Sequence, residues 1–394
     1  MRSSLPRMRG FSVVELLVSV AIGLLALGFA TRLVTGAESA KSSAIATSDS
    51  MQNGMLAMFS ISGDAQQAGY GLNDPLLVGC NTFFRDTEGY ELAAAGGLHP
   101  LVPALIESNG TRPDTITLYS GSSQGGSGTA RVVGYDANLP TSLQLGGEPY
   151  GFSRGDVVVL AAEDGSGDCA LAQVSADPVK PISPANPVLK VAEVDVDFRY
   201  NANEGSIGIP VLPGNMRVFH LGRAGALSFH TWSVDQGFLQ LRATDMAGAS
   251  RLPATVADNI VSIKAQYGFD TRDEENFVKR EILSVGKWSP TMIDADGIGG
   301  VGNRGDYQRI VALRIAVVAR SKKRESQQGG CTATTARPTV FASQSPVGVN
   351  AVPMEVDVAV PGDPVDWRCY RYRVFETVMP MRNSQWSPNN AAVH

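Results

Sequence analysis

Two stretches of the chain contain residue types and spacings that could support chemistry. The first, Gly121-Ser122-Ser123-Gln124-Gly125, fits the G-x-S-x-G pattern of a nucleophilic serine. That pattern is catalytic when the serine lies on a sharp turn from a strand into a helix, whereas here glycine and serine run on into a predicted strand. We expect a flexible loop over 121–128. Because no other set of residues converges on a catalytic site, the chain is not expected to be an enzyme.

The second stretch begins at Asp294 and starts like a calcium-binding loop. An EF-hand needs an oxygen ligand at its fifth position and a glutamate at its twelfth, and this sequence has isoleucine and glycine there. An EF-hand is therefore excluded. A different calcium loop that uses Asp294, Asp296 and Asp306 remains an alternative. The default expectation is an ordinary solvated turn, with no cofactor and no metal.

The cysteines are expected to form two disulfides rather than a metal site. An even number of cysteines in an exported domain is typical of a disulfide framework, and no Cys-x-x-Cys spacing or clustered histidines favour zinc. Three pairings are possible, and we favour the one that joins neighbours in the sequence. The expected pairs are Cys80–Cys169 and Cys331–Cys369.

A single carboxylate lies inside the longest apolar run of the chain. Residues 11–30 read FSVVELLVSVAIGLLALGFA, with Glu15 as the one charged residue. About twenty apolar residues span the hydrocarbon core of a bilayer. A charge within such a helix costs about 2.5–3.5 kcal/mol on insertion scales, so Glu15 should have a partner and a function.

The residues around this run decide between three kinds of N-terminus. The preceding MRSSLPRMRG is short and basic, which predicts that the N-terminus stays cytoplasmic and that the rest is exported. A secretory signal needs a small-residue cleavage site after its apolar core, and Ala37-Glu38-Ser39-Ala40 fits poorly. A plain membrane anchor fits the length but leaves Glu15 unexplained.

The combination of basic leader, Gly10, Phe11, Glu15 and apolar helix resembles the type IV prepilin N-terminus. The resemblance implies cleavage between Gly10 and Phe11 by a prepilin peptidase, followed by N-methylation of Phe11. It also implies that Glu15 neutralises the N-terminal amine of a neighbouring subunit. Such a pairing is physically reasonable, because each buried charge relieves the desolvation cost of the other.

Composition limits the remaining functions. The 394-residue chain has a formal net charge of −5, and removal of residues 1–10 with their three arginines leaves −8. An acidic product argues against nucleic-acid binding, which needs a basic surface. The apolar content of 43% can support a sizeable core, and the abundant glycine and proline suit many turns between strands.

A single long helix is expected from Phe11 to about Ala68, roughly 85 Å in length. Its first part, 11–34, would span the membrane or enter a fibre core, and its second part, 35–70, would be amphipathic. The apolar stripe expected on the second part is Ala37, Ala40, Ala44, Met51, Met55 and Met58. Four glycines in the helix are compatible with close helix packing or with local melting: Gly23, Gly28, Gly36 and Gly54.

Residues 71–394 are expected to form a β-rich globular domain, after an irregular segment at 72–112. Strands are expected over 114–119, 130–135, 156–162, 171–175, 188–200, 216–221, 226–234, 238–244, 261–269, 310–319 and 370–379. The three strands between 216 and 244 should form a meander with His220 and His230 on neighbouring strands. A helical turn is expected at 257–260, and the very apolar strand 310–319 should be central.

Several later stretches resemble the PilW family of minor pilins, and by chain order also the J-type pseudopilins of type II secretion. The stretches are 66–71, 155–159, 259–268, 307–321, and 372–377 leading to 381–383. The resemblance implies an α+β, type IV pilin-like fold with one long helix on a mainly antiparallel sheet. It further implies a minor pilin that primes pilus assembly and forms part of a tip complex.

The same resemblance implies partners and a location. The partners would be other minor pilins, the major pilin, the prepilin peptidase, the inner-membrane assembly platform, membrane lipid and a tip adhesin. The chain would cross the inner membrane once, with a cytoplasmic N-terminus and a periplasmic domain, before moving to the pilus tip. A pseudopilin of type II secretion and a membrane-anchored exported enzyme remain as alternatives.

Overall fold

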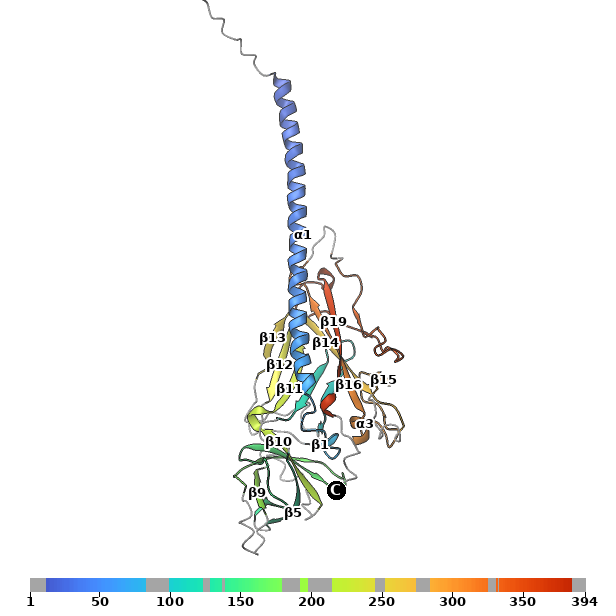
Figure 1. Ribbon diagram of the computed structural model, residues 1–394. Helices are drawn as coiled ribbons and strands as arrows, with labels where there is room; N and C mark the ends of the chain where they lie inside the picture. The colour runs from blue at the N-terminus through green and yellow to red at the C-terminus, as the bar shows by residue number, and fades with distance from the viewer. Residues whose placement is uncertain are drawn as a thin grey trace, which may run out of the picture.

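The structure is a computed structural model of the chain (Figure 1). It describes residues 12–82, 99–122, 128–136, 139–178, 192–197, 215–244, 252–273, 284–324, 331 and 333–384. The leader 1–10, Phe11 and most of the glycine- and serine-rich segment at 121–128 lie outside these residues. The predictions of leader cleavage and N-methylation therefore stay predictions.

One helix dominates the molecule, as expected. The helix α1 spans Val13–Gln67, 55 residues, and Ser12 caps its start by accepting a hydrogen bond from the Val14 amide. At 1.5 Å per residue it is about 82 Å long. The chain leaves the helix through Gly69 and Gly71, whose φ angles of 84° and 75° favour glycine. Figure 1 shows the first half standing clear of the globular part.

The second half of α1 packs on two sheets through alanines and Ile61, and of the predicted stripe Met58 is partly buried against the same core. Ala57, Ile61 and Ala65 are buried, whereas Met51 and Met55 are 42% and 47% exposed. Gly54 and the buried alanines let the helix approach the sheets closely, with Ile61 as a larger side chain in the interface. Helical spacing alone did not identify which of two overlapping apolar faces packs inward.

The first sheet lies under one side of α1 and has the order β13-β12-β11-β4-β3. Its strands are antiparallel and span Ala254–Asp258 (β13), Phe238–Thr244 (β12), Ser228–Asp235 (β11), Thr115–Ser120 (β4) and Ala104–Glu107 (β3). The strand β13 replaces the helical turn predicted at 257–260. That prediction was wrong because the chain turns at Asn259, whose φ is 55°, and passes directly from β13 into a strand of the second sheet.

The second sheet has the order β15-β14-β16-β19 and lies under the other side of α1. Its strands span Lys287–Ser289 (β15), Ile260–Phe269 (β14), Ile310–Arg320 (β16) and Tyr372–Pro380 (β19), and all are antiparallel. The strand β16 is internal and ten of its eleven residues are buried. This confirms the prediction that the most apolar run would be a central strand.

A closed barrel lies at the end of the molecule farthest from the exposed part of α1 (Figure 1). Its antiparallel order is β10-β5-β6-β9-β8-β7, closed by pairing of β7 with β10. The strands are Met216–Arg223 (β10), Thr129–Asp136 (β5), Leu139–Leu145 (β6), Ala192–Asp197 (β9), Ala170–Val174 (β8) and Asp156–Ala162 (β7). Its core includes Leu143, Val158 and Val194.

The predicted meander between 216 and 244 was wrong in its first strand. The strand β10 belongs to the barrel, and the short 3-10 helix η1 (Ala224–Ala226) carries the chain from it to β11. His220 and His230 therefore lie in different sheets. His220 binds the buried Asp156 on the neighbouring barrel strand at 2.9 Å, and His230 binds Asp64 of α1 at 2.8 Å.

Short elements complete the fold. The segment 72–112, expected to be irregular, contains β1 (Cys80–Thr82), β2 (His99–Leu101) and β3. The remaining elements are α3 (Arg304–Gln308), β17 (Thr339–Val340), β18 (Met354–Glu355), η2 (Trp367–Cys369) and η3 (Arg382–Ser384). Strands of two or three residues carry too little periodic pattern to be found in a sequence.

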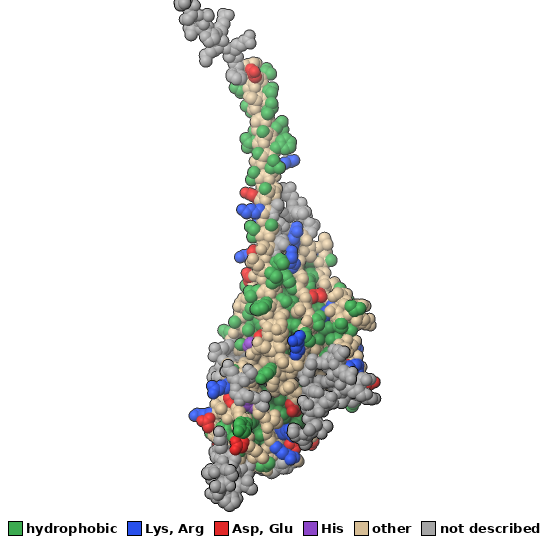
Figure 2. All heavy atoms as spheres, viewed as in Figure 1, with side chains coloured by type: hydrophobic (Ala, Val, Ile, Leu, Met, Phe, Trp, Pro, Cys, Tyr) green, Lys and Arg blue, Asp and Glu red, His purple; other side chains and the backbone are tan. Residues whose placement is uncertain are grey.

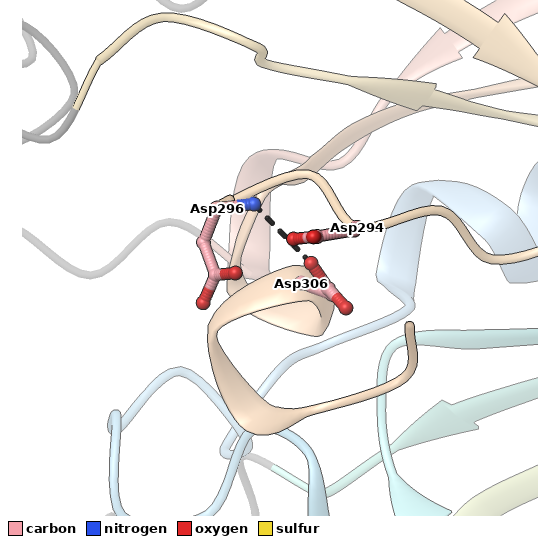
Figure 3. Close-up of side chains that lie close together, drawn as sticks. All are labelled: Asp294, Asp296 and Asp306. Carbon is pink, nitrogen blue, oxygen red and sulfur yellow. Dashed lines mark hydrogen bonds between the residues drawn. The ribbon is translucent and has the colours of Figure 1, made fainter. Parts of the chain in front are cut away.

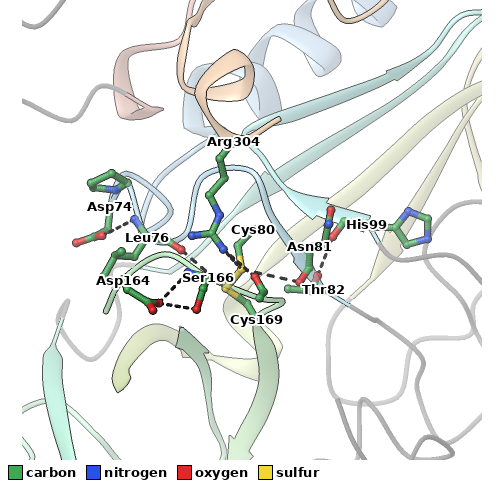
Figure 4. The surroundings of a disulfide bond; sticks show 12 residues. Asp74, Leu76, Cys80, Asn81, Thr82, His99, Asp164, Ser166, Cys169 and Arg304 are labelled. Carbon is green, nitrogen blue, oxygen red and sulfur yellow. Dashed lines mark hydrogen bonds between the residues drawn. A yellow bond between two sulfur atoms is a disulfide. The ribbon is translucent and has the colours of Figure 1, made fainter. Parts of the chain in front are cut away.

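Two disulfides join Cys80 to Cys169 and Cys331 to Cys369, which are the pairs favoured from the sequence. The first ties β1 to the start of the barrel strand β8 (Figure 4). Arg304 points at this bond and donates hydrogen bonds of 3.1 Å to the Cys80 sulfur and to the Gly167 carbonyl. Burial lowers the pKa of the Arg304 guanidinium, although nearby carboxylates oppose the effect.

Replacement of Cys80 and Cys169 by serine is expected to lower the free energy of unfolding by about 2–5 kcal/mol, because the bond closes a long loop. The two cysteines are 89 residues apart, against 38 for the second pair. Removal of the second bond should therefore cost about 1 kcal/mol less. Urea unfolding of the full chain in detergent micelles measures both changes. An unaltered midpoint for the Cys80/Cys169 variant would contradict the prediction.

Candidate functional site

The exposed half of α1 is the most apolar surface among the described residues. Residues Val13–Glu38 are long and apolar enough to cross a membrane, and none of the segment is buried within the molecule. Thirteen large apolar side chains between Val13 and Val34 are each at least half exposed. Figure 2 shows hydrophobic side chains along both edges of the visible face of this part of the helix.

This surface cannot remain in water. Covering the thirteen side chains is worth on the order of 20 kcal/mol, whereas whole domains are stable by only about 5–15 kcal/mol. A term of this size favours lipid or other apolar helices as the surroundings of the half-helix. Its hydroxyl groups suit either setting, because Ser19, Thr31 and Thr35 donate their hydroxyl protons to carbonyls of the preceding helical turn.

Glu15 lies in the first turn of α1 and is the one acidic residue there. Helix N-termini carry unpaired amide groups and a partial positive charge, which favour an anion. The nearest cation along the helix is Arg32, more than four turns away. A cation that pairs with Glu15 inside an apolar bundle must therefore come from outside the described residues.

The glycines of α1 fall into two groups. A methyl group added at Gly23, Gly28 or Gly36 would meet no atom within 4 Å, so the isolated subunit does not require these glycines. A Cβ atom at Gly54 would lie 2.0 Å from the ring of Phe375. Gly54 therefore sets how closely the helix approaches β19, and the other three keep the exposed half-helix narrow, as close helix packing needs.

Gly54→Ala is expected to destabilise the chain by about 1–3 kcal/mol, because the Phe375 ring must move to admit the methyl group. The matched control is Gly63→Ala on the same helix, where a Cβ atom meets nothing within 4 Å. That variant should be neutral or more stable by up to about 1 kcal/mol. Thermal unfolding in detergent compares them, and equal effects would show that the contact does not limit the helix position.

Polar contacts fix the lower half of α1 in position and orientation. The Asp64 carboxylate accepts hydrogen bonds of 2.8 Å from the Trp232 indole and from the His230 ring, two residues apart on one face of β11. Asn53 donates to Asp258 at 2.6 Å, and Asn383 donates to the last carbonyls of the helix. The exposed half-helix therefore continues from a segment that is anchored to both sheets.

The three aspartates of the alternative calcium loop lie close together. Possible ligand atoms of Asp294, Asp296 and Asp306 lie within 4.8 Å of one another (Figure 3). Asp306 is fully buried, and its two oxygens accept hydrogen bonds from four backbone amides. The donors are Ala295 (2.5 Å), Asp296 (3.2 Å), Gly302 (2.7 Å) and Asn303 (3.3 Å). The solvated turn expected by default is therefore a loop built around a buried carboxylate.

The serine motif shows no strand-to-helix turn in its described part. Gly121 and Ser122 follow β4 and bond to the backbone of Tyr70 and Leu221. A side chain at Gly121 would clash with both carbonyls, at 2.9 and 2.8 Å. This glycine is needed because the end of α1, β4 and β10 meet here.

Comparison with known proteins gives one family. Residues 231–383 match the family model described as type IV pilus-assembly protein W. The match covers 153 of the 394 residues and runs from β11 to η3, so it contains the second sheet and part of the first. The prediction of a PilW-type protein is confirmed over this region.

One solved structure and no curated protein match the chain. The structure is a type IV-like pilin from Thermus thermophilus, with 11% identity and a TM-score of 0.33. The alignment covers 86% of this chain and 97% of that one. The expected α+β class, a long apolar N-terminal helix on mainly antiparallel sheets, is confirmed by the elements described above.

Proposed function

We propose that the chain is a minor pilin of the type IV pilus, which helps to prime assembly and forms part of a tip complex. The observation that carries this proposal is the exposed apolar half-helix on a domain whose residues 231–383 match a pilus-assembly family. A helix of this kind needs an apolar environment at every stage. A membrane supplies it before assembly, and a bundle of pilin helices supplies it afterwards.

The proposed mechanism follows from the two halves of α1. The upper half waits in the inner membrane, with the leader on the cytoplasmic side and the sheets and barrel in the periplasm. After the peptidase cuts between Gly10 and Phe11, the half-helix moves sideways into a bundle of neighbouring helices. Its surface stays dry throughout, so the transfer costs little. Glu15 meets the methylated amine of a neighbouring subunit in that bundle.

The proposed partners divide between the two halves in the same way. Other minor pilins and the major pilin pack on the upper half-helix, while the domain selects lateral neighbours and contributes to the surface that carries an adhesin. The assembly platform acts on the helix at the membrane. No described cluster of residues suggests catalysis.

Deletion of the gene, followed by complementation with the full chain, tests this function. We expect far fewer surface fibres in the deletion strain, normal secretion of exported enzymes, and recovery of the fibres on complementation. The opposite pattern, lost secretion with normal fibres, would overturn the proposal in favour of a secretion pseudopilin. Unaltered fibres and unaltered secretion would overturn both.

A further inference from the structure

The strand β19 forms one edge of the second sheet and offers unpaired backbone groups along it. Its pairing with β16 has no register shift. At the two ends of this pairing, the Met381 amide donates to the Val311 carbonyl and the Ser321 amide donates to the Arg371 carbonyl. The odd-numbered residues of β19 therefore direct their backbone groups toward β16. In an antiparallel ladder these alternate with residues whose N–H and C=O groups point away.

The outward-pointing groups belong to Val374, Glu376 and Val378. None of their backbone groups bonds to another described residue on that side. Each therefore offers one donor and one acceptor to a further strand. Natural edge strands are usually blunted by shortness, bulges or proline, whereas β19 is nine residues long and regular, with its one proline in last position.

The side chains along the edge are also available. Val374 and Val378 are 37% and 38% exposed. Arg373, near the membrane-side end of the strand, contacts only the Met51 sulfur, at 3.9 Å, and has no described carboxylate partner. An added strand with an acidic residue at the same end would pair with this cation.

The direction of β19 decides which neighbours can pair with it. Phe375 lies beside Gly54 and Asn383 lies beside Gln66, so β19 runs in the same direction as α1. All subunits inserted in one membrane point the same way. An antiparallel partner strand from such a neighbour must therefore run opposite to its own α1.

The opposite edge of the molecule has a strand of this kind. The strand β13 is the free edge of the first sheet; it is five residues long and has one register shift in its pairing with β12. Figure 1 shows it on the other side of α1 from β19. It ends at Asp258, beside Asn53. Its first residue, Ala254, lies opposite Leu241 of β12, which lies opposite Trp232 of β11. Trp232 binds Asp64, which is eleven residues farther along α1 than Asn53. The strand β13 thus runs opposite to α1, with an exposed carboxylate at the membrane-side end.

We propose that β19 is a docking edge to which a co-oriented neighbouring pilin adds an edge strand, antiparallel, in the manner of β13. The added strand is apolar along its length and acidic at its membrane-side end, where it meets Arg373. The contact is head-to-tail, since one subunit uses its β19 edge and the next uses the opposite edge. Repetition gives a row around the fibre rather than a closed dimer. The inference rests on the proposed function, which supplies co-oriented neighbours.

Proline substitution separates docking from folding. Val374→Pro removes an outward amide that the fold does not use, and proline is tolerated at such edge positions. We expect the variant to keep its thermal midpoint in detergent but to enter fibres roughly tenfold less, since main-chain bonds carry strand addition. Val378→Pro should behave alike. Thr377→Pro is the control for the folding assay. It removes an amide that points toward β16 and should lower the thermal midpoint.

A photo-cross-linking amino acid in place of Val378, in the full chain in assembling cells, identifies what docks. We expect a cross-link to a neighbouring pilin, mapped by mass spectrometry to an edge strand and lost with Val374→Pro. The same probe at Tyr150, 81% exposed on the barrel loop, should not reach that strand. A cross-link to a helix, a loop or a non-pilin protein would overturn the inference. Normal fibre entry of both outward proline variants would overturn it too.

These results distinguish the two proposals. If the docking edge is wrong and the pilin function is right, the wild-type chain is present in fibres and the proline variants enter equally well. If the pilin function is wrong, the wild-type chain is absent from fibres and gives no cross-link to any pilin.

Discussion

Glu15→Ala is expected to reduce the amount of the chain in purified fibres at least about tenfold while leaving membrane insertion and leader cleavage unchanged. In a helix bundle the variant leaves a neighbour's amine buried without its partner, and breaking a buried pair costs about 3–5 kcal/mol. Even about 1.4 kcal/mol of this is a factor of ten in an equilibrium. Insertion should not suffer, because alanine enters the bilayer more easily than glutamate. Quantitative immunoblots of membranes and sheared fibres measure the ratio.

The matched control is Glu38→Ala, which removes the carboxylate at the other end of the same exposed segment. Glu38 lies beyond the apolar run and is exposed, so its loss should leave fibre entry close to that of the wild type. Equal effects of the two substitutions would point to net charge rather than to a buried pair. Normal fibre entry of Glu15→Ala would remove the charge-pair argument altogether.

Asp114→Ala is expected to destabilise the globular part by about 3–5 kcal/mol, because it leaves the Lys264 ammonium group buried without a counter-charge. Both side chains are fully buried and form an ion pair. Lys264 also donates to the carbonyls of Gly110 and Arg112, at 2.8 and 2.9 Å. Asp114 also accepts bonds from the amides of Ala265 and Asn109. The pair thus joins the start of β4 to the middle of β14, between the two sheets.

A second substitution shows whether the charge or the hydrogen bonds dominate. Lys264→Met in the Asp114→Ala background removes the unpaired charge and keeps the volume of the side chain. It should recover a large part of the lost free energy of unfolding. As a surface control, Glu163→Ala removes ion pairs with the exposed Arg131 and Arg217 and should cost about 1 kcal/mol. If Asp114→Ala cost no more than Glu163→Ala, the ion pair would not stabilise the contact between sheets.

The sequence was sufficient for features that depend on local pattern and composition. The helix boundaries follow from an unbroken run without proline and from Gly69 and Gly71 after it. The central position of β16 follows from ten consecutive residues of which nine are apolar, and the β-branched residues among them favour a buried strand over a buried helix. Glu15 is conspicuous in the sequence for a similar reason, since it is one charge in an apolar run, and its pairing with a neighbour's amine stays a prediction.

Apart from the two disulfide pairs, features that depend on contacts distant in the sequence could not be predicted. Nothing local shows that β10 closes a barrel with β7 while β11 joins another sheet, because both strands have the same alternating pattern. The buried face of α1 was missed because Gly54 and Ala57 are weakly apolar, whereas Met51 and Met55 are strongly apolar and exposed. Lys264 is a buried cation inside a strand, which composition alone would place at the surface.

The most direct test of the account is mass spectrometry of sheared, purified fibres from cells that make the full chain. We expect peptides from the sheets and the barrel in the fibre fraction, together with an N-terminal peptide that begins at methylated Phe11. Absence of the chain from fibres, in cells whose membranes contain it in processed form, would contradict the claim that the exposed helix is built to enter a bundle of pilin helices.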